Sequence, residues 1–490
     1  MIFVKALSAS TLTAALLAST AASALTADDL WKEMQGAAQF AGLALQAGTI
    51  VEGERQTLYK DVALSAPGGF GKVTLTEVTL VEREDGSVTV YPGTFGIDEG
   101  AGAPANFSID HDALTIDVAE DDKGRSYDIK AGRFDVQGLV QGGGSTSFTY
   151  QISDLAARLS AAETGYLLDA RVGHYTAGSS NAVAGQGVEQ ISNQEGDDLQ
   201  VMLGLTVPAG LTLASLENPK AFDEAVRKGL GLLVEGSGAA AWARVESKGG
   251  GADFAVNYKV DSTKISMILN ADTAAIDVSA TALSGDVSTP LLPEPVTFSV
   301  ASLSEGVAVP VVAPTGGRMH VSAKIEDLDF SEGAWSMFDP GQVITRGPIN
   351  LDLDLKADVK MDLLEEMAAD EEGRPSRTPP EVTAATISKL FLSFGGATLD
   401  GVGDFALKGA FLSPGAPPPT PIGSAEIKAT GLNQLIDNLI SIGLIPPDQE
   451  SALRFGLAMI AKPGVNPEEL VSSIEAKEDG QILFNGQRIK

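Results

Sequence analysis

The chain has 490 residues, a formal net charge of −31 at pH 7 and no cysteine. A protein this acidic repels the phosphates of nucleic acids, which excludes nucleic-acid binding. Without cysteine there can be no disulfide, no thiolate metal site, no thiol catalysis and no lipid attached to an N-terminal cysteine. Core burial and sheet hydrogen bonds must therefore stabilise the fold, and the chain is long enough for both.

The first 24 residues have the layout of a secretory signal peptide. Lys5 gives a positive start, residues 6–21 are weakly apolar, and Ala22-Ser23-Ala24 is a small-residue cleavage site. A retained anchor would need about 20 mainly apolar residues, so cleavage after Ala24 is the better interpretation. The mature chain would begin at Leu25, carry a charge of 33 − 65 = −32 and contain no transmembrane segment. Because it lacks cysteine, we expect a periplasmic protein.

Two helices are predicted in the N-terminal half. Thr26 is a capping residue for the first, and the aspartates that follow it suit the positive end of a helix dipole. The second helix starts at Asn218-Pro219, and we expect it to reach Leu233. Its apolar stripe contains Phe222, Val226, Leu230 and Leu233.

Alternation of apolar and polar residues, which indicates a strand with one buried face, recurs along the chain. In its clearest example, Leu351–Met361, every odd residue is apolar and every even residue is charged. We expect the odd positions to face the core and the even positions to face water. Turn signals such as Glu84-Asp85-Gly86, Asn270-Ala271-Asp272 and Asp479-Gly480 favour antiparallel meanders.

Two further helices are predicted near the C-terminus, within residues 431–462. The first runs from Leu432 to Ile440 with apolar residues at helical spacing. The second begins at Pro446-Pro447-Asp448, and we expect three of its residues to face inward, namely Leu453, Leu457 and Ile460. A final hairpin follows.

These patterns predict a mainly β fold, with elongated, curved antiparallel sheets and a few amphipathic helices. The N-terminal helix and the C-terminal helix–helix–hairpin are its distinctive ends. Residues 290–295 are the candidate boundary between an N-terminal region, 25–290, and a C-terminal region, 291–490, although one continuous sheet could also join the two. Residues 367–380 and 412–421 are interpreted as long loops.

No catalytic or metal site is predicted. The three histidines, His111, His174 and His320, are far apart in sequence and form no His-Glu-x-x-His motif. The chain contains no Gly-x-Ser-x-Gly elbow, and its acidic clusters lack the spacing of a calcium loop. We therefore expect no cofactor and no enzymatic activity. A hydrolase site assembled from distant strands is the remaining alternative.

Several short motifs of the C-terminal half stand out: Trp335–Pro340, Arg346–Ile349, Leu392–Ala397 and Asp479–Gln487. With them, residues 320–490 resemble an uncharacterised bacterial family, domain-of-unknown-function family 2125. That resemblance implies no catalytic residues. More distantly, strand-rich segments closing on Gly431-Leu432 and an amphipathic helix resemble AsmA-like envelope proteins. This second resemblance implies extended β-structure with an apolar interior and an association with lipid handling.

The candidate ligand surface lies on three strands between residues 254 and 278. It consists of Phe254, Val256 and Tyr258, then Ile265, Met267 and Leu269, then Ile276 and Val278. Neighbouring hairpins in register would place these side chains on one sheet face, and few helices are available to cover that face. We expect an exported, non-enzymatic envelope protein that binds or carries a lipid or another hydrophobic ligand. The alternative is a structural or interaction protein of the envelope, with its sheet faces closed by its own helices and loops.

Overall fold

The computed structural model describes residues 25–40, 42–65, 72–98, 105–121, 124–141, 144–162, 165–183, 187–208, 211, 219–249, 253–377, 379–408 and 420–488. The predicted signal peptide, residues 1–24, lies outside the described residues. By its internal contacts the chain divides into two units, Met1–Asn257 and Tyr258–Lys490, and each is described by itself.

The first unit consists of one helix, a long run of strands, a second helix and a further strand. In chain order these are α2 (Ala27–Phe40), β1 (Ala44–Gln46), β2 (Thr49–Glu52), β3 (Gln56–Ser65), β4 (Lys72–Glu82), β5 (Val88–Pro92), β6 (Phe95–Asp98), β7 (Ala105–Asp112), β8 (Thr115–Asp121), β9 (Gly124–Gln141), β10 (Gly144–Ala162), β11 (Gly165–Val183), β12 (Val188–Thr206), α3 (Pro219–Arg227) and β13 (Gly231–Lys248). From β9 to β13 each strand pairs antiparallel with the next one in the chain. The division between the units falls within β14 (Phe254–Leu269).

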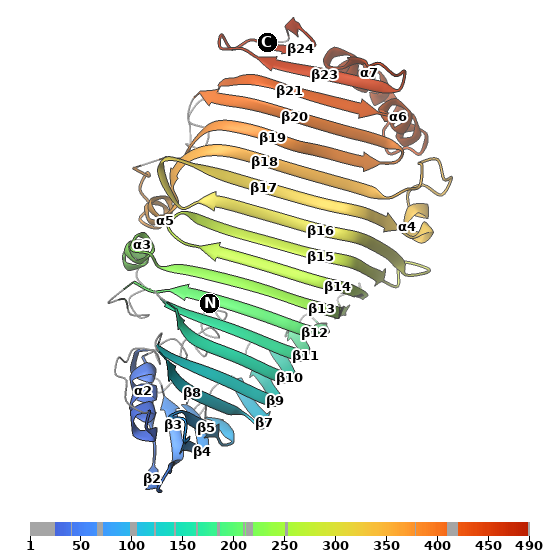
Figure 1. The fold of residues 1–490 in the computed structure, drawn as a ribbon. Coiled ribbons are helices and arrows are strands. Elements are labelled where there is room, and N and C mark those ends of the chain that lie inside the picture. Colours follow the sequence, from blue (N-terminus) through green and yellow to red (C-terminus); the bar gives the residue numbers. More distant parts are fainter. Residues whose placement is uncertain are drawn as a thin grey trace. The chain divides into compact units, whose positions relative to one another are not determined.

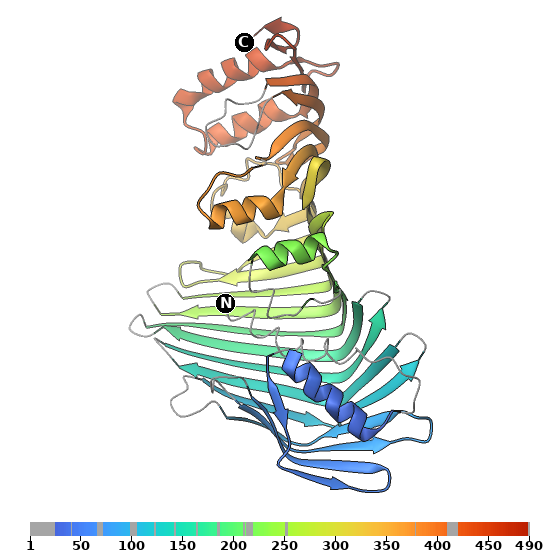
Figure 2. The same cartoon turned by 90° about the vertical axis from the view of Figure 1, so that its left-hand side faces the viewer.

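Helix α2 closes the core of the first unit. The predicted cap is confirmed, because the Thr26 hydroxyl accepts a hydrogen bond from the Asp29 backbone N–H at 3.1 Å. Leu30 is fully buried, and the Trp31 ring stacks on Tyr59 of β3 with 3.9 Å between centroids. These residues pack with strand residues such as Leu80 and Val118 in one apolar cluster. The helix thus covers the sheet at this place (Figure 2).

The predicted extension of the second helix to Leu233 is wrong. Helix α3 ends at Arg227, and Leu233 belongs to β13. Gly229 adopts φ +103°, and the next N–H, that of Leu230, bonds the carbonyl of Ala225 at 2.8 Å. This reversal is the usual glycine termination of a helix, and it overrides the apolar spacing that continues beyond it.

The second unit is a sheet with helices between some of its strands (Figure 1). Its elements are the larger part of β14, then β15 (Thr273–Ser288), β16 (Val296–Pro310), β17 (Val312–Phe330), α4 (Glu332–Ser336), β18 (Ile349–Asp362), α5 (Leu363–Glu371), β19 (Glu381–Phe394), β20 (Ala397–Lys408), β21 (Thr420–Thr430), α6 (Leu432–Ser441), the 3-10 turn η3 (Pro447–Gln449), α7 (Glu450–Ile460), β22 (Lys462–Pro463), β23 (Glu469–Ala476), β24 (Ile482–Phe484) and β25 (Gln487–Arg488). Consecutive strands from β15 to β21 pair antiparallel, and β23, β24 and β25 extend the sheet from β21.

The predicted fold class, mainly β with antiparallel sheets and a few helices, is confirmed, and so is the C-terminal helix–helix–hairpin. Residues 290–295 connect β15 to β16, which pair with each other, so the segment is a turn within one sheet. The loop predicted for residues 367–380 is wrong at its start, because α5 extends to Glu371. Asp362 caps this helix by accepting a hydrogen bond from the Glu365 N–H at 3.2 Å. Residues 412–419 of the other predicted loop lie outside the described residues.

Helix α7 forms where the sequence predicts it, but its predicted inward orientation is wrong. No described residue of α7 is buried. Leu453 and Ile460, both expected to face inward, are exposed, and Leu457 is half-buried. The outer side carries Phe455, which is 69% exposed. The helix therefore presents apolar side chains to solvent.

The segment between β17 and β18, which contains α4 and which we call the α4 loop (residues 331–348), is organised around a buried carboxylate. Asp339 is fully buried and accepts hydrogen bonds from the backbone N–H groups of Val343 and Ile344, both at 2.9 Å. It also accepts one from the Arg346 guanidinium, whose carbon lies 4.7 Å from the centroid of the Trp335 ring. The Trp335–Pro340 and Arg346–Ile349 motifs thus have a structural role.

The contacts of Asp339 in the α4 loop should make the stability of the second unit depend on pH. Burial tends to raise the pKa of the Asp339 carboxyl, but the Arg346 guanidinium and two backbone N–H groups outweigh burial and lower the pKa. The stabilisation is therefore complete above the unfolded pKa of about 3.9 and is lost as the pH falls through the lower folded pKa. We expect Asp339→Asn to lower the melting temperature clearly at pH 7 and less at pH 3. An equal difference at both pH values would contradict this origin.

Candidate functional site

One face of the second unit's sheet is lined by rows of aliphatic side chains. Residues directly opposite each other in neighbouring strands share a face. One row begins at Ile276 and continues through Val307, Val321, Leu355 and Ile387. A second row contains Leu303, Ile325, Leu351, Leu392, Leu399, Ala429 and Leu470. Between them runs a third row, of Val278, Glu305, Ala323, Leu353, Leu390, Gly401, Ile427 and Ser472. We call these three rows the apolar face.

The opposite face of the same strands is polar and carries ion pairs. Arg318 of β17 lies opposite Asp358 of β18, with 3.0 Å between nitrogen and oxygen. Lys389 of β19 reaches Asp400 of β20 at 2.7 Å. Such exposed pairs add little stability, but they show which side of the sheet is hydrophilic.

The apolar face is not covered by a packed layer. Every leucine, isoleucine and valine of its three rows is half-buried or exposed. The strand forms, as β18, but the prediction that the odd residues of Leu351–Met361 face a core holds only for Val359, which is buried. Leu351, Leu353 and Leu355 are half-buried, and so are the charged residues between them. Neighbouring strands shield these leucines from the sides, and nothing described buries them from above.

The helices of the second unit lie beside the apolar face. Helix α5 follows β18, whereas the α4 loop precedes it, so the two occupy opposite strand ends (Figure 1). Helices α5, α6 and α7 project to one side of the sheet (Figure 2). The end of α7 meets the third row, where Ser472 donates a hydrogen bond to the carbonyl of Ile460 at 2.6 Å. The helices thus border the face and leave its middle uncovered.

The structure brings four of the predicted ligand-contacting residues together on the β14–β15 hairpin. The Asn270 N–H bonds the carbonyl of Thr273 at 2.9 Å across the predicted turn, and the Ser262 and Thr281 hydroxyls meet at 2.7 Å. This register places Met267 opposite Ile276 and Ile265 opposite Val278. The four side chains are 37–44% exposed.

The other predicted residues lie elsewhere on β14. Leu269 is half-buried next to the turn of the hairpin. Tyr258 is exposed, in the part of β14 that belongs to the second unit. Phe254, which is exposed, and Val256, which is half-buried, belong to the first unit.

The sequence prediction missed most of the apolar face, which extends from β15 to β23. One sequence signal for the missed part of the face is a shift of the apolar residues from odd to even positions within a strand. In β17 the apolar residues are odd-numbered from Met319 to Ile325 and even-numbered from Leu328. Between them Asp327 has φ +53°, and its N–H bonds the Asn350 side chain at 2.9 Å. Such a bulge restarts the alternation, so the face continues beyond it. Ala282 of β15, with φ +50°, marks a similar change.

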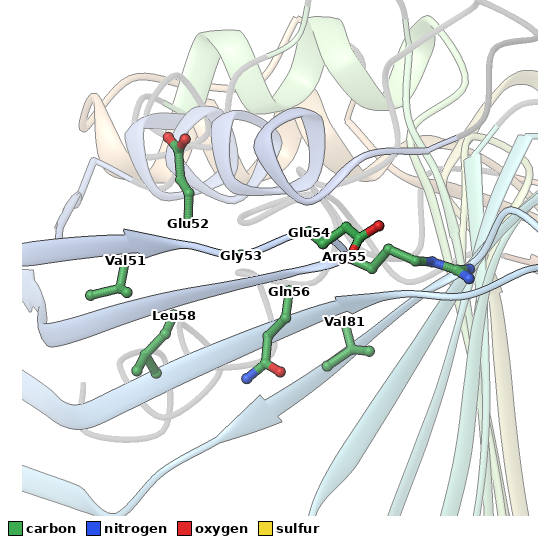
Figure 3. Close-up of a pocket in the computed structure, with 8 residues that line it drawn as sticks. All are labelled: Val51, Glu52, Gly53, Glu54, Arg55, Gln56, Leu58 and Val81. Carbon is green, nitrogen blue, oxygen red and sulfur yellow. The ribbon is translucent and has the colours of Figure 1, made fainter.

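The first unit has a shallow depression beside the β2–β3 hairpin (Figure 3). Its lining combines Val51, Leu58 and Val81 with the turn residues Glu52–Gln56. Arg55 in this turn reaches Glu84 at 3.4 Å, and both side chains are largely exposed. An open depression with solvated charges offers a ligand little burial, so the apolar face remains the stronger candidate.

The histidines have separate environments. Nε2 of His111 lies 3.1 Å from the Gly93 carbonyl oxygen, and Nδ1 of His174 lies 2.7 Å from Asp197. In the second unit, Nε2 of His320 lies 3.4 Å from Asp354 on the polar face. These contacts are ordinary for histidines on strands.

Comparisons with known proteins relate part of the chain to a bacterial family. None of the described helices is both long and apolar enough to cross a membrane. A search of the curated proteins gives no match to the chain. A family model described as "uncharacterized protein conserved in bacteria" (DUF2125) matches residues 237–477, which include the strands of the apolar face and the α4 loop. Over this stretch the chain belongs to that uncharacterised bacterial family.

Proposed function

We propose that the apolar face holds a lipid or another hydrophobic ligand, in an exported and non-enzymatic protein of the cell envelope. The observation that supports this proposal is the uncovered state of the aliphatic rows from β15 to β23. Apolar area in water is unfavourable by about 25 cal/mol per Å². A large contiguous patch of this kind usually marks a binding surface.

The chemistry of the face favours a ligand with acyl chains. Its side chains are almost all aliphatic, and the polar interruptions within the rows are Glu305 and Ser472. A surface with so few hydrogen-bonding groups recognises a flexible apolar ligand by contact area and not by directional bonds. The predicted signal peptide would deliver the protein to the envelope, where such lipids are abundant.

Native mass spectrometry of protein released from its own envelope by osmotic shock tests the proposal. We expect the wild-type protein to carry copurified lipid, and after lipid removal to show the mass of a chain that starts at Leu25. Met267→Glu should lose the lipid, because a carboxylate in the middle of the apolar hairpin repels acyl chains. Its melting temperature should change little, since Met267 is 40% exposed.

Ser266→Glu is the matched control, because it adds the same charge at the adjacent position, on the other side of β14. This variant should keep the lipid. A wild-type protein free of lipid would instead support the structural or interaction role. Undiminished lipid in the folded Met267→Glu variant would contradict the placement of the ligand.

A further inference from the structure

Large apolar side chains are exposed at one strand end of the second unit. They come from the α4 loop and from the segment containing α6 and α7, and they are between 40% and 69% exposed. We call this set the apolar edge: Met337, Phe338, Leu444, Leu453, Phe455 and Met459. Each lies at or beyond a strand end, outside the three rows of the apolar face.

The two elements of the apolar edge are neighbours. The β19–β20 turn contains Gly395 at φ +59°, and a Cβ there would lie 2.7 Å from Leu435 of α6 and 3.1 Å from Ile344 of the α4 loop. The turn is therefore held between the two elements, and only glycine fits. Figure 1 shows α4, α6 and α7 at the same end of the strands. The α4 loop and α6 thus meet at the β19–β20 turn, and the exposed side chains lie at this end of the strands.

The apolar edge also adjoins the apolar face. The Trp335 ring of α4 stacks on Phe394, at the end of β19, with 6.1 Å between centroids. At the end of α7, the carbonyl of Ile460 accepts the hydrogen bond from Ser472 of the face. A lipid leaving the face at this strand end would meet the apolar edge first.

We propose that the apolar edge inserts into a lipid surface with zwitterionic head groups, from which the apolar face takes its ligand. This inference rests on the proposed function and adds the place of lipid exchange. A short helix with a bare apolar side binds the interface of a bilayer in proportion to the apolar area that it buries. Phe455 and Met459 lie four residues apart on α7 and would enter together.

The charges of the apolar edge favour a zwitterionic surface over an anionic one. Arg346 is bound to Glu332 at 3.2 Å and to Asp339, and Arg454 is bound to Glu450 at 2.9 Å and to Asp437. Both arginines are thus neutralised by carboxylates. The whole chain carries a charge of −31, which repels anionic head groups. Attraction must therefore come from the apolar side chains.

Flotation with phosphatidylcholine vesicles tests the inference. We expect the full-length protein to float with the vesicles, and Phe455→Glu or Met459→Glu to weaken binding by about tenfold or more. Met367→Glu is the matched control, because Met367 is 58% exposed on α5, at the opposite strand end, and this variant should bind as the wild type does. Replacing half of the lipid with phosphatidylglycerol should weaken binding at low salt, and added salt should reduce that difference.

Several outcomes would overturn the inference. They are no binding of the wild type to phosphatidylcholine, unchanged binding of Met459→Glu, and stronger binding to the anionic vesicles at low salt. Absent vesicle binding together with a dimer that Met459→Glu dissociates would show an interface between copies instead.

The two proposals can fail separately. Vesicle binding without copurified lipid would contradict the proposed function and lipid exchange, and would leave only the attachment of the apolar edge to a lipid surface. Copurified lipid with no vesicle binding would contradict only the binding of the apolar edge to a lipid surface. Met267→Glu should lose copurified lipid and still float.

Discussion

Arg125→Met is expected to destabilise the first unit by about 3–5 kcal/mol, because it leaves a buried carboxylate without its partner. The Arg125 side chain is 8% exposed and pairs with Glu33 of α2, and with Glu120 at 3.3 Å. Tyr127 donates a further hydrogen bond to Glu33 at 2.6 Å. Urea unfolding followed by tryptophan fluorescence measures the loss, since Trp31 reports on this core.

The double variant Glu33→Met/Arg125→Met separates the ion pair from simple packing. In the double variant two methionines of similar volume replace both charges, so neither of these charges stays buried without its partner. We therefore expect its loss of unfolding free energy to be smaller, by about 2 kcal/mol or more, than the sum of the losses in the two single variants. Lys32→Met provides the control on the same helix, because the Lys32–Asp28 pair is exposed and its removal should leave stability close to wild type. If the losses of unfolding free energy in the two single variants simply add up in the double variant, the two charges do not interact in the folded chain.

Trp335→Ala is expected to cost about 3–5 kcal/mol of the second unit's stability. The Trp335 ring is 3% exposed and contacts Phe338, with 5.3 Å between centroids, as well as Phe394 and Arg346. Removing the ring opens a cavity under the α4 loop and leaves the Arg346 guanidinium without the aromatic surface that covers it. Thermal and urea unfolding of the full-length protein would measure the change.

Met337→Ala is the control for this prediction. Met337 is two residues from Trp335 and is 64% exposed, so its truncation should change stability by less than about 0.5 kcal/mol. Trp335→Phe should restore part of the loss, because a ring still fills the site. Equal stability of Trp335→Ala and Met337→Ala would mean that the α4 loop does not anchor the unit.

The sequence predicted the strands well because alternation depends only on the local pleat. It predicted the β14–β15 hairpin from its apolar residues and from the Asn270-Ala271-Asp272 turn, and both are present. Alternation cannot tell what covers a face, however. Leu353 and Met267 both lie in alternating strand segments. Only Met267 was expected on an uncovered face, yet both residues lie on uncovered faces.

Helix orientation was the weaker part of the prediction. The spacing of Leu453, Leu457 and Ile460 indicates an amphipathic helix, but packing onto a sheet depends on distant strands that the spacing does not report. The end of α3 was readable in principle, because Lys228-Gly229 is an ordinary signal for a helix C-terminus. The apolar edge also depends on the fold, since its residues from the α4 loop and from α7 are more than a hundred positions apart.

The pairing of successive strands from β15 to β21 has a consequence for how the second unit gains and loses its structure. Each strand of this run pairs with its neighbours in the chain, so most of the stabilising contacts span only a short stretch of sequence. Folding can then begin at any hairpin and proceed by adding one strand at a time, as in a linear array of repeats. Unfolding would start at a free end and propagate inward, so different probes along this part of the chain would report different transitions.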